Sequence, residues 1–205
     1  MRFTAKYLPS LLAIVFMTGL LASCSSGPKA TQGAPTASAK VEQLAEKDRA
    51  AYVAALADLE KGNTKEAAAS LNKIAYANPG YPDAWVNLAS ASYKTKNIDA
   101  AKIAIEHAHK LQPQSADIDN VRGLIYVEEG RYKDAEQLYI AALNLDPKNA
   151  GIHYNLALLY DVYYQDLAKA ITHYESYLSL STQKDEETEA WRDELKQMLT
   201  RGSAQ

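Results

Sequence analysis

The side chains able to do chemistry are few in this 205-residue sequence, and their spacing identifies no catalytic group. There are four histidines and one cysteine, and no HExxH, GxSxG or glycine-rich phosphate-binding motif. His107 and His109 are two residues apart, so on a helix they point to different faces and make poor joint metal ligands. His153 and His173 are solitary in the sequence, and we expect ordinary structural or surface roles for them. We therefore predict no enzyme activity, no metal and no cofactor.

The single cysteine, Cys24, follows an apolar run that is preceded by basic residues. Arg2 and Lys6 come before residues 11–22, which are apolar apart from a threonine and a glycine. This run has the length of a secretory signal and is short for a membrane span. The sequence Leu-Ala-Ser-Cys at 21–24 resembles the lipobox of bacterial lipoproteins. The resemblance implies a signal peptide over 1–23 and lipidation of Cys24; the alternative is an ordinary secretory signal with a chance cysteine.

The residues after Cys24 bear on where the protein is held. In lipoproteins of Gram-negative bacteria an Asp after the cysteine usually retains the protein at the inner membrane, and this chain has Ser25. The resemblance thus implies the periplasmic face of the outer membrane. Residues 24–40 are rich in Ser, Thr, Gly, Pro and Ala and hold no large apolar side chain, so we expect a flexible linker.

The composition of the whole chain favours a folded, non-basic protein. Hydrophobic residues make up 47% and charged residues 23%, which is enough apolar material for a core. The net charge is −3, which argues against a nucleic-acid partner. Both phenylalanines lie in the first twenty residues, whereas the 14 tyrosines lie mostly in the body.

A regular repeat, with a period of about 34 residues, organises the body of the chain. Pro79, Pro113 and Pro147 are one period apart, and small residues recur at the same spacing, at 55, 89, 123 and 157 and at 67, 101 and 135. This pattern resembles the tetratricopeptide repeat (TPR), in which each repeat is a pair of antiparallel helices. It implies an all-α solenoid over 41–205, with repeats at about 48–81, 82–115, 116–149 and 150–183.

The sequence also departs from the regular repeat at several positions. Gly62, Asn97 and Gly130 lie near the turn inside a repeat, where we expect left-handed backbone. The fourth repeat has one extra residue, within 161–166. Arg122 stands where the family prefers leucine, so the third repeat either packs less closely or turns this side chain outward.

Both ends of the solenoid carry their own signals. Trp191, Leu195, Met198 and Leu199 fall on one helix face, which predicts an amphipathic capping helix at about 185–200. At the other end, we expect residues 41–44 to join the first repeat in one long helix.

The resemblance implies that the first helix of each repeat lines a concave groove for a partner. That groove would use Tyr52, Leu56, Leu59, Val86, Asn87, Ser90, Tyr93, Asn120, Leu124, Val127, Tyr154, Asn155, Leu158 and Asp161. The set is mostly apolar, which fits an amphipathic helix or an apolar peptide. The alternative is that these residues are repeat core, or are covered by the protein's own linker. A second candidate surface is Tyr160, Tyr163 and Tyr164, unless they form a well-packed insertion loop.

These features together indicate a membrane-anchored, non-catalytic adaptor that binds another protein of the cell envelope. One hypothesis is an assembly factor similar to the pilotin lipoproteins of type IV pilus or secretion complexes. A second is a regulator of a peptidoglycan synthase or hydrolase. A third, which rests on a likeness of residues 155–199 to accessory proteins, is a partner of a TonB/ExbB/ExbD-type system. The sequence leaves the partner and the oligomeric state open.

Overall fold

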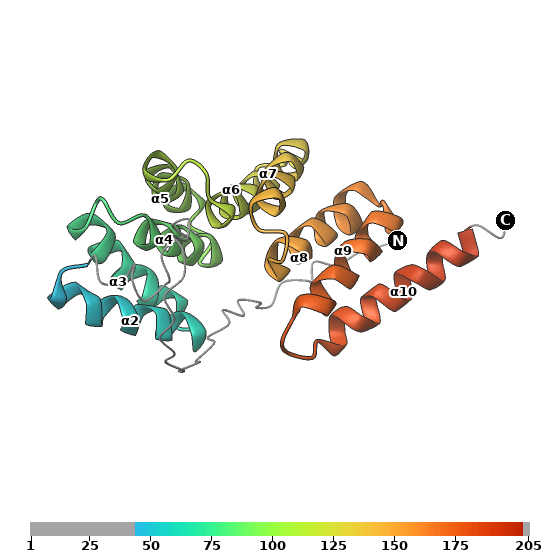
Figure 1. The fold of residues 1–205 in the computed structure, drawn as a ribbon, viewed down its shortest axis with the longest axis horizontal. Coiled ribbons are helices and arrows are strands. Elements are labelled where there is room, and N and C mark those ends of the chain that lie inside the picture. Colours follow the sequence, from blue (N-terminus) through green and yellow to red (C-terminus); the bar gives the residue numbers. More distant parts are fainter. Residues whose placement is uncertain (1–43, 203–205) are drawn as a thin grey trace, which may run out of the picture.

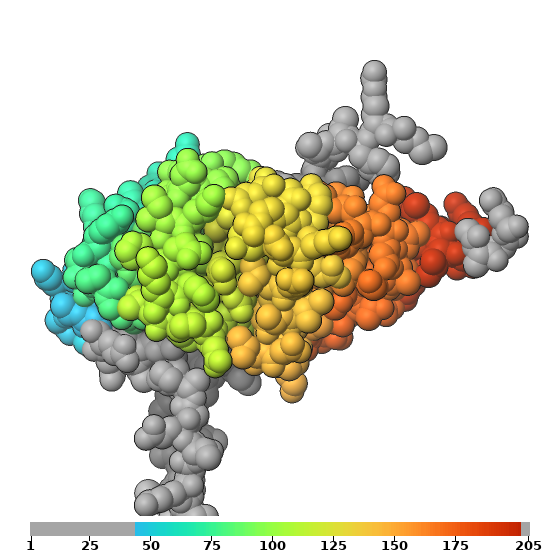
Figure 2. Space-filling model, turned by 90° about the horizontal axis from the view of Figure 1, so that it is seen from above, coloured from blue at the N-terminus to red at the C-terminus, as the bar shows by residue number. Residues whose placement is uncertain are grey.

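The computed structural model describes residues 44–202, and within this range the regular structure is helical. The helices follow one another along the long axis of the molecule, from α2 to α10 (Figure 1). In the space-filling view the colours also run in chain order from one end to the other (Figure 2). The all-α TPR-type solenoid predicted from the repeat period is therefore confirmed. The predicted signal peptide, lipidated Cys24 and linker lie outside the described residues.

The described helices form successive pairs that end in one additional helix. The pairs are α2 (Glu46–Glu60) with α3 (Thr64–Ala77), α4 (Pro82–Lys94) with α5 (Ile98–Leu111), α6 (Ala116–Glu128) with α7 (Tyr132–Leu145), and α8 (Ala150–Leu158), continued by the π-helix η1 (Leu159–Tyr164), with α9 (Leu167–Leu180). The last helix is α10 (Glu186–Gly202). Among the helices between residues 44 and 202, none is both long enough and apolar enough to cross a bilayer.

Pro82 illustrates how the period sets the start of each pair. It is the first residue of α4, where a missing N–H costs no helical hydrogen bond. Helices α6 and α8 begin at Ala116 and Ala150, which follow Pro82 by one and two periods. We refer to α2, α4, α6 and α8 as the A helices, and to α3, α5, α7 and α9 as the B helices.

The turns inside the pairs contain a left-handed residue at a fixed place. Gly62, Lys96 and Gly130 have φ values of 83°, 61° and 73°, and they recur at the repeat period. The expectation for Asn97 was wrong by one position. Asn97 is instead the N-cap of α5, where its side chain accepts a hydrogen bond from the Ala100 N–H. The matching residue of the fourth pair is Gln165, with φ 54°, one place later than the period predicts.

That shift is explained by η1, which absorbs the extra residue. A π-helix adds one residue to an α-helix without breaking it, because its hydrogen bonds span one residue more. The π-helical turn η1 spans residues 159–164, and the left-handed Gln165 follows it directly. The insertion predicted within 161–166 thus overlaps the π-helix, and it changes which faces Tyr160, Tyr163 and Tyr164 present.

Small buried residues allow the two helices of each pair to approach. Ala55, Ala89 and Ala157 on the A helices are at most 1% exposed, and Ala67, Ala101 and Ala135 on the B helices are fully buried. The tightest approach is at Gly123 on α6. A Cβ atom there would lie 2.5 Å from Cε1 of Tyr139, a ring that is only 1% exposed. Only glycine fits at this position.

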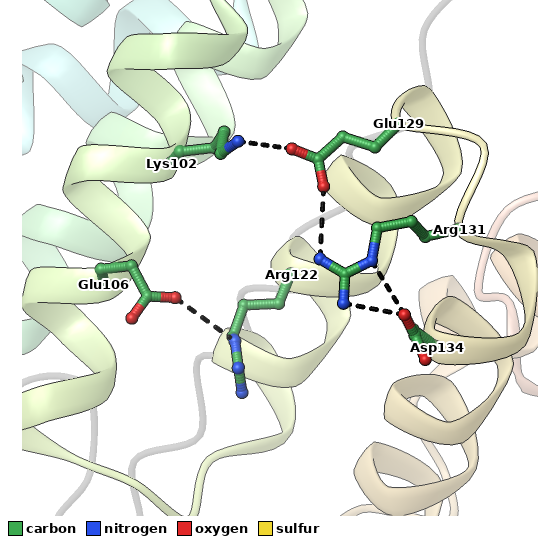
Figure 3. A network of polar contacts seen from close by, with 6 residues as sticks. All are labelled: Lys102, Glu106, Arg122, Glu129, Arg131 and Asp134. Carbon is green, nitrogen blue, oxygen red and sulfur yellow. Dashed lines mark hydrogen bonds and ion pairs between the residues drawn. The ribbon is translucent and has the colours of Figure 1, made fainter.

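The buried side chains divide into two clusters. The first core cluster runs from Leu44 to Ile125, and the second core cluster runs from Ala135 to Leu195, so the division falls in the third pair. Ion pairs lie beside this division in two groups (Figure 3). Glu106 of α5 pairs with Arg122 in the middle of α6. The second group joins α5 to the turn between α6 and α7 and to the start of α7, and consists of Lys102, Glu129, Arg131 and Asp134. Arg122 is half-buried and lies between Glu106 and Asp119, so its charge is paired rather than turned outward.

The two ends differ from what the sequence predicts. Leu44 is buried but precedes α2, which begins at Glu46, so it does not extend that helix. In α10, Leu195 is buried and Trp191 is half-buried, whereas Met198 and Leu199 are 47% and 44% exposed. Only the first part of the predicted apolar face therefore covers the end of the solenoid.

Candidate partner-binding surface

One stripe of each A helix carries the residues predicted to line the groove. They recur at i, i+4 and i+7, as in Val86, Ser90 and Tyr93 of α4, and therefore lie on one side of each helix. We define the A-helix face as the partly exposed members of this set other than the asparagines and Asp161: Leu56, Val86, Ser90, Tyr93, Leu124, Val127, Tyr154 and Leu158. Most are apolar, and they combine accessible area with fixed positions on rigid helices.

Two of the predicted groove residues belong to the packed interior instead. Tyr52 is 3% exposed and Leu59 is 7% exposed, and both are part of the first core cluster. The ring of Tyr52 packs edge-on against Tyr81 at 5.5 Å between centroids. Burial, followed by the nearby Tyr81 and Asp83, holds the pKa of the Tyr52 hydroxyl far above its usual range, so that hydroxyl stays neutral.

The predicted asparagines bind neighbouring repeats. The Asn87 side-chain amide donates to the Tyr52 hydroxyl at 2.7 Å, and the Asn155 amide donates to Asn120 Oδ1 at 2.8 Å. Each bond joins adjacent A helices across 35 residues of sequence. Since these N–H groups are used within the protein, the asparagines fix the spacing of the A helices, and the prediction that they bind a peptide backbone stays untested.

Tyr93 of this face and the buried Tyr174 of α9 both donate to carboxylates. Tyr93 donates to Glu128 at 3.2 Å, and Lys96 pairs with the same carboxylate at 2.7 Å. At the other end, Asp161 accepts from Tyr174 at 3.2 Å. Burial raises the pKa of Asp161, an effect that the Tyr174 hydrogen bond partly opposes.

Tyr154 lies among other tyrosines toward that end of the A-helix face. Its ring centroid is 5.0 Å from that of Tyr177 and 6.2 Å from that of Tyr174. Burial, followed by the charges of Asp185 and Glu187, raises the pKa of Tyr154 to about 12. Tyr174 and Tyr177 are buried, so Tyr154 is the ring of this cluster that the face presents, and its hydroxyl is neutral at physiological pH.

The second candidate surface is divided by the π-helix. Tyr160 is only 5% exposed, and its hydroxyl donates to Glu136 at 2.6 Å, so it belongs to the second core cluster. Tyr164 is half-buried beside it. Tyr163 is 43% exposed and stacks on Tyr132 at 4.3 Å. The accessible part of this surface is thus Tyr163 with the neighbouring Val162, which is 53% exposed.

Sequence reasoning missed a groove on the B-helix side. It has a volume of about 220 Å³ between α3, α4 and α5, with Trp85 and Leu88 in its lining. Tyr76 and Ile103 border it and are 60% and 54% exposed, so two large apolar side chains flank the groove at the surface. The signal that could have revealed it is the apolar type of residues 76 and 103 on otherwise polar faces of α3 and α5.

The histidines are less scattered than the sequence predicts. His107 stacks on Trp85 at 4.4 Å between ring centroids. His153 and His173 are not solitary, because the pairing of α8 with α9 brings their Nδ1 atoms to 3.0 Å. Within residues 44–202, no group of three or more His, Cys, Asp or Glu side chains is arranged to hold a metal ion.

Comparison with known proteins agrees with this architecture. A family model described as tetratricopeptide repeat matches residues 58–125, and one described as TPR repeat matches residues 123–162. The chain has the tetratricopeptide repeat fold. A TPR domain is a scaffold that binds other proteins and is in general not catalytic, so a protein-binding adaptor is the function class that the fold supports.

A curated bacterial relative matches part of the chain. The uncharacterized protein y4yS of Sinorhizobium fredii is 31% identical over 81 residues, which span 40% of this chain and 44% of that protein. The chain thus matches less than half the length of this curated relative.

Solved structures extend the likeness over more of the chain. The TPR protein TTC0263 of Thermus thermophilus superposes with a TM-score of 0.62, at 21% identity over 76% of this chain and 84% of that one. The pilF protein of Pseudomonas aeruginosa gives a TM-score of 0.56, at 26% identity over 68% of this chain and 63% of that one. MamA of Desulfovibrio magneticus RS-1 gives 0.53, at 21% identity over 67% of this chain and 77% of that one.

Proposed function

We propose that the protein is a lipid-anchored, non-catalytic adaptor that binds a protein partner of the bacterial cell envelope on its A-helix face. The observation that carries this proposal is the stripe of partly exposed apolar residues repeated on the A helices. The partner element that fits such a stripe is an amphipathic helix or an apolar peptide, because the face offers apolar area and neutral tyrosines. The charged side chains of Glu128 and Lys96, next to Tyr93 of this face, are already paired with each other.

The A-helix face can be tested by photo-crosslinking in cells. A photoreactive residue at Leu124, which is partly exposed on α6, should capture one discrete envelope protein. The matched control is Ile140 on α7, which is 44% exposed but lies on a B helix and should capture nothing discrete. Capture from the Ile140 probe alone would mean that the partner binds on the B-helix side instead. Capture from a probe at Tyr163 alone would move it to the η1 surface.

A substitution separates binding from stability at the same place. Leu124→Glu should abolish capture of the partner while leaving the urea midpoint nearly unchanged, since the added charge can reach solvent. Ile140→Glu is the matched control and should leave partner binding intact. A large loss of stability in Leu124→Glu would mean that Leu124 is core and would contradict its place on an accessible surface.

Anchoring rests on the lipobox and has its own test. Cys24→Ser removes the thiol that would be lipidated, so the protein should leave the membrane fraction. Ser25→Asp keeps the thiol and should instead shift the protein from the outer to the inner membrane of a Gram-negative host. Membrane retention of Cys24→Ser would contradict lipidation.

We place the assembly-factor role first, because TPR pilotin-type lipoproteins combine a lipid anchor with TPR repeats, the two features that we propose for this chain. The similarity to pilF, at 26% identity over 68% of this chain, gives this role a comparison protein of the same fold. Deleting the gene should then abolish secretin multimers. Altered peptidoglycan crosslinking with multimers intact would favour the cell-wall role, and failed ligand uptake would favour a TonB-type role.

A further inference from the structure

Two histidines that lie 20 residues apart in the sequence meet between α8 and α9. His153 is on α8 and His173 is on α9, and their Nδ1 atoms are 3.0 Å apart. Both side chains are partly exposed, so the pair is fixed by packing yet open to small solutes. Neither the TPR fold nor the proposed adaptor function requires histidines at these positions.

The backbone determines which nitrogen of His153 is available. Nε2 of His153 lies 3.2 Å from the carbonyl oxygen of Pro147, which can only accept a hydrogen bond. Neutral His153 therefore keeps its proton on Nε2, and the lone pair on Nδ1 faces His173. A ring N–H held by a backbone carbonyl is the arrangement that orients histidines as metal ligands.

The distance between the two Nδ1 atoms matches the distance between two nitrogen ligands of one metal ion. Nitrogen ligands about 2.0–2.1 Å from an ion lie about 2.9 Å apart at a right angle and about 3.4 Å apart at a tetrahedral angle. The observed 3.0 Å is close to the right-angle value, which is the geometry of tetragonal copper and nickel sites. We propose that His153 and His173 are a two-histidine site for a divalent transition-metal ion, with Cu²⁺ as the ion that the geometry favours.

The surroundings are compatible with a bound ion. The Tyr160 ring stacks on His173 at 5.7 Å between centroids and shields one side of it. The nearby cation Lys169 opposes a metal ion, but its charge is offset by Asp166 at 3.3 Å. Burial, followed by the charges of His153 and Lys169, lowers the pKa of His173 to about 4, so its imidazole is neutral at pH 7. Since no third His, Cys, Asp or Glu of the described chain completes the group, water would fill the other positions.

A bound ion would join the two helices of the irregular fourth pair. It would bridge α8 to α9 beside η1 and should raise thermal stability by mass action.

The test uses the full chain, without a polyhistidine tag and with Cys24→Ser so that no thiol competes. His107→Gln and His109→Gln are added, which leaves His153 and His173 as the only imidazoles. Cu²⁺ is titrated at neutral pH. We expect one equivalent to bind with an increase in Tm, and an electron paramagnetic resonance spectrum with hyperfine coupling to two imidazole nitrogens.

His153→Gln in this background should weaken Cu²⁺ binding about tenfold or more, with an unchanged circular dichroism spectrum. Zn²⁺ in place of Cu²⁺ should bind more weakly, as its position in the affinity series predicts. The absence of two-nitrogen coupling in the parent protein would overturn the proposal even if His153→Gln failed to fold. Equal Cu²⁺ binding by parent and His153→Gln would also overturn it and would leave the pair as an Nδ1–H···Nδ1 hydrogen bond.

Discussion

The first core cluster, from Leu44 to Ile125, and the second, from Ala135 to Leu195, are built on the same repeat frame but from different side chains. The first is rich in alanine and aliphatic residues, with Trp85 as its largest member. The second holds several tyrosines and abuts the π-helix and the histidine pair. The repeat period determines where the helices lie. The buried side chains determine how the stability of each helix pair changes with mutation and with pH.

Carboxylates are the clearest difference. Tyr160, Tyr174 and Tyr177, all buried, donate to Glu136, Asp161 and Asp185 respectively. In the first cluster, the Trp85 indole N–H donates to the Pro79 carbonyl and the Tyr52 hydroxyl accepts from the Asn87 amide, and both of these partners are neutral. The second cluster therefore depends on ionisable groups, and we expect it to be the more sensitive to acid.

The largest expected effect on stability comes from adding a Cβ atom at Gly123, where the two core clusters meet. Gly123→Ala would place a Cβ atom 2.5 Å from the buried Tyr139 ring, which has nowhere to move. Overpacking of this kind costs about 1–3 kcal/mol, which outweighs the better helix propensity of alanine. Urea unfolding should show a lower midpoint for this variant.

Gly151→Ala is the matched control for Gly123→Ala. Gly151 is exposed near the start of α8, and its added Cβ would meet Asn149 Oδ1 at an ordinary 3.5 Å. This variant should be neutral or slightly stabilised. Equal losses in both variants would mean that the contact between Gly123 and Tyr139 does not limit the packing of α6 on α7.

A smaller effect is expected where α10 joins the second cluster. Asp185 accepts hydrogen bonds from the Thr188 N–H and hydroxyl and from Tyr177. Asp185→Ala leaves these donors without their acceptor and should cost about 1–2 kcal/mol. Hydrogen exchange should become faster in α10. Glu186→Ala removes the same charge from an exposed side chain and should change stability little, which separates the cap from the general effect of charge.

The sequence was sufficient for the repeat but not for these local features. The period of prolines and alanines predicts the pairing, because small residues and helix ends must recur wherever helices pack in the same way. The period points to residue 96, one repeat from Gly62 and from Gly130, but residue type favours Asn97, because asparagine adopts left-handed backbone more readily than lysine. The sequence could not bring His153 near His173, because that contact depends on the relative rotation of α8 and α9.

The candidate surface was predictable only in outline. The i, i+4, i+7 spacing identifies the stripe on each A helix, but it does not say which members the neighbouring repeats bury. Tyr52 and Leu59 are buried, whereas Leu56 between them is partly exposed. Tyr160 was predicted to share a candidate surface with Tyr163 and Tyr164, but the π-helix turns its ring inward and leaves Tyr163 exposed.

Acid should weaken the second cluster through His173. Its pKa is lowered to about 4 in the folded protein, mainly by burial, while an unfolded histidine has a pKa near 6.5. Between these values the unfolded chain binds more protons, so this contribution to stability falls as the pH drops from about 6.5 to about 4. Chemical denaturation across this range, in a chelating buffer, should show a steeper loss for the natural protein than for His173→Gln. Equal slopes would contradict the assignment.

The smallest expected effect is a gain in stability. It is expected when the left-handed residue in one turn of each region is replaced with glycine. Gln165 and Lys96 both have left-handed backbone that glycine adopts without strain, so replacing either with glycine should relieve that strain. Gln165→Gly should stabilise the protein by up to about 1 kcal/mol, because relief of about 1–2 kcal/mol of left-handed strain outweighs the entropy that glycine adds to the unfolded chain. Lys96→Gly should gain less, because it also removes the ion pair between Lys96 and Glu128. The urea midpoint would order the variants as Gln165→Gly, then Lys96→Gly, then the natural chain. If Lys96→Gly gained stability and Gln165→Gly did not, the inserted residue would strain the backbone of η1 rather than that of Gln165.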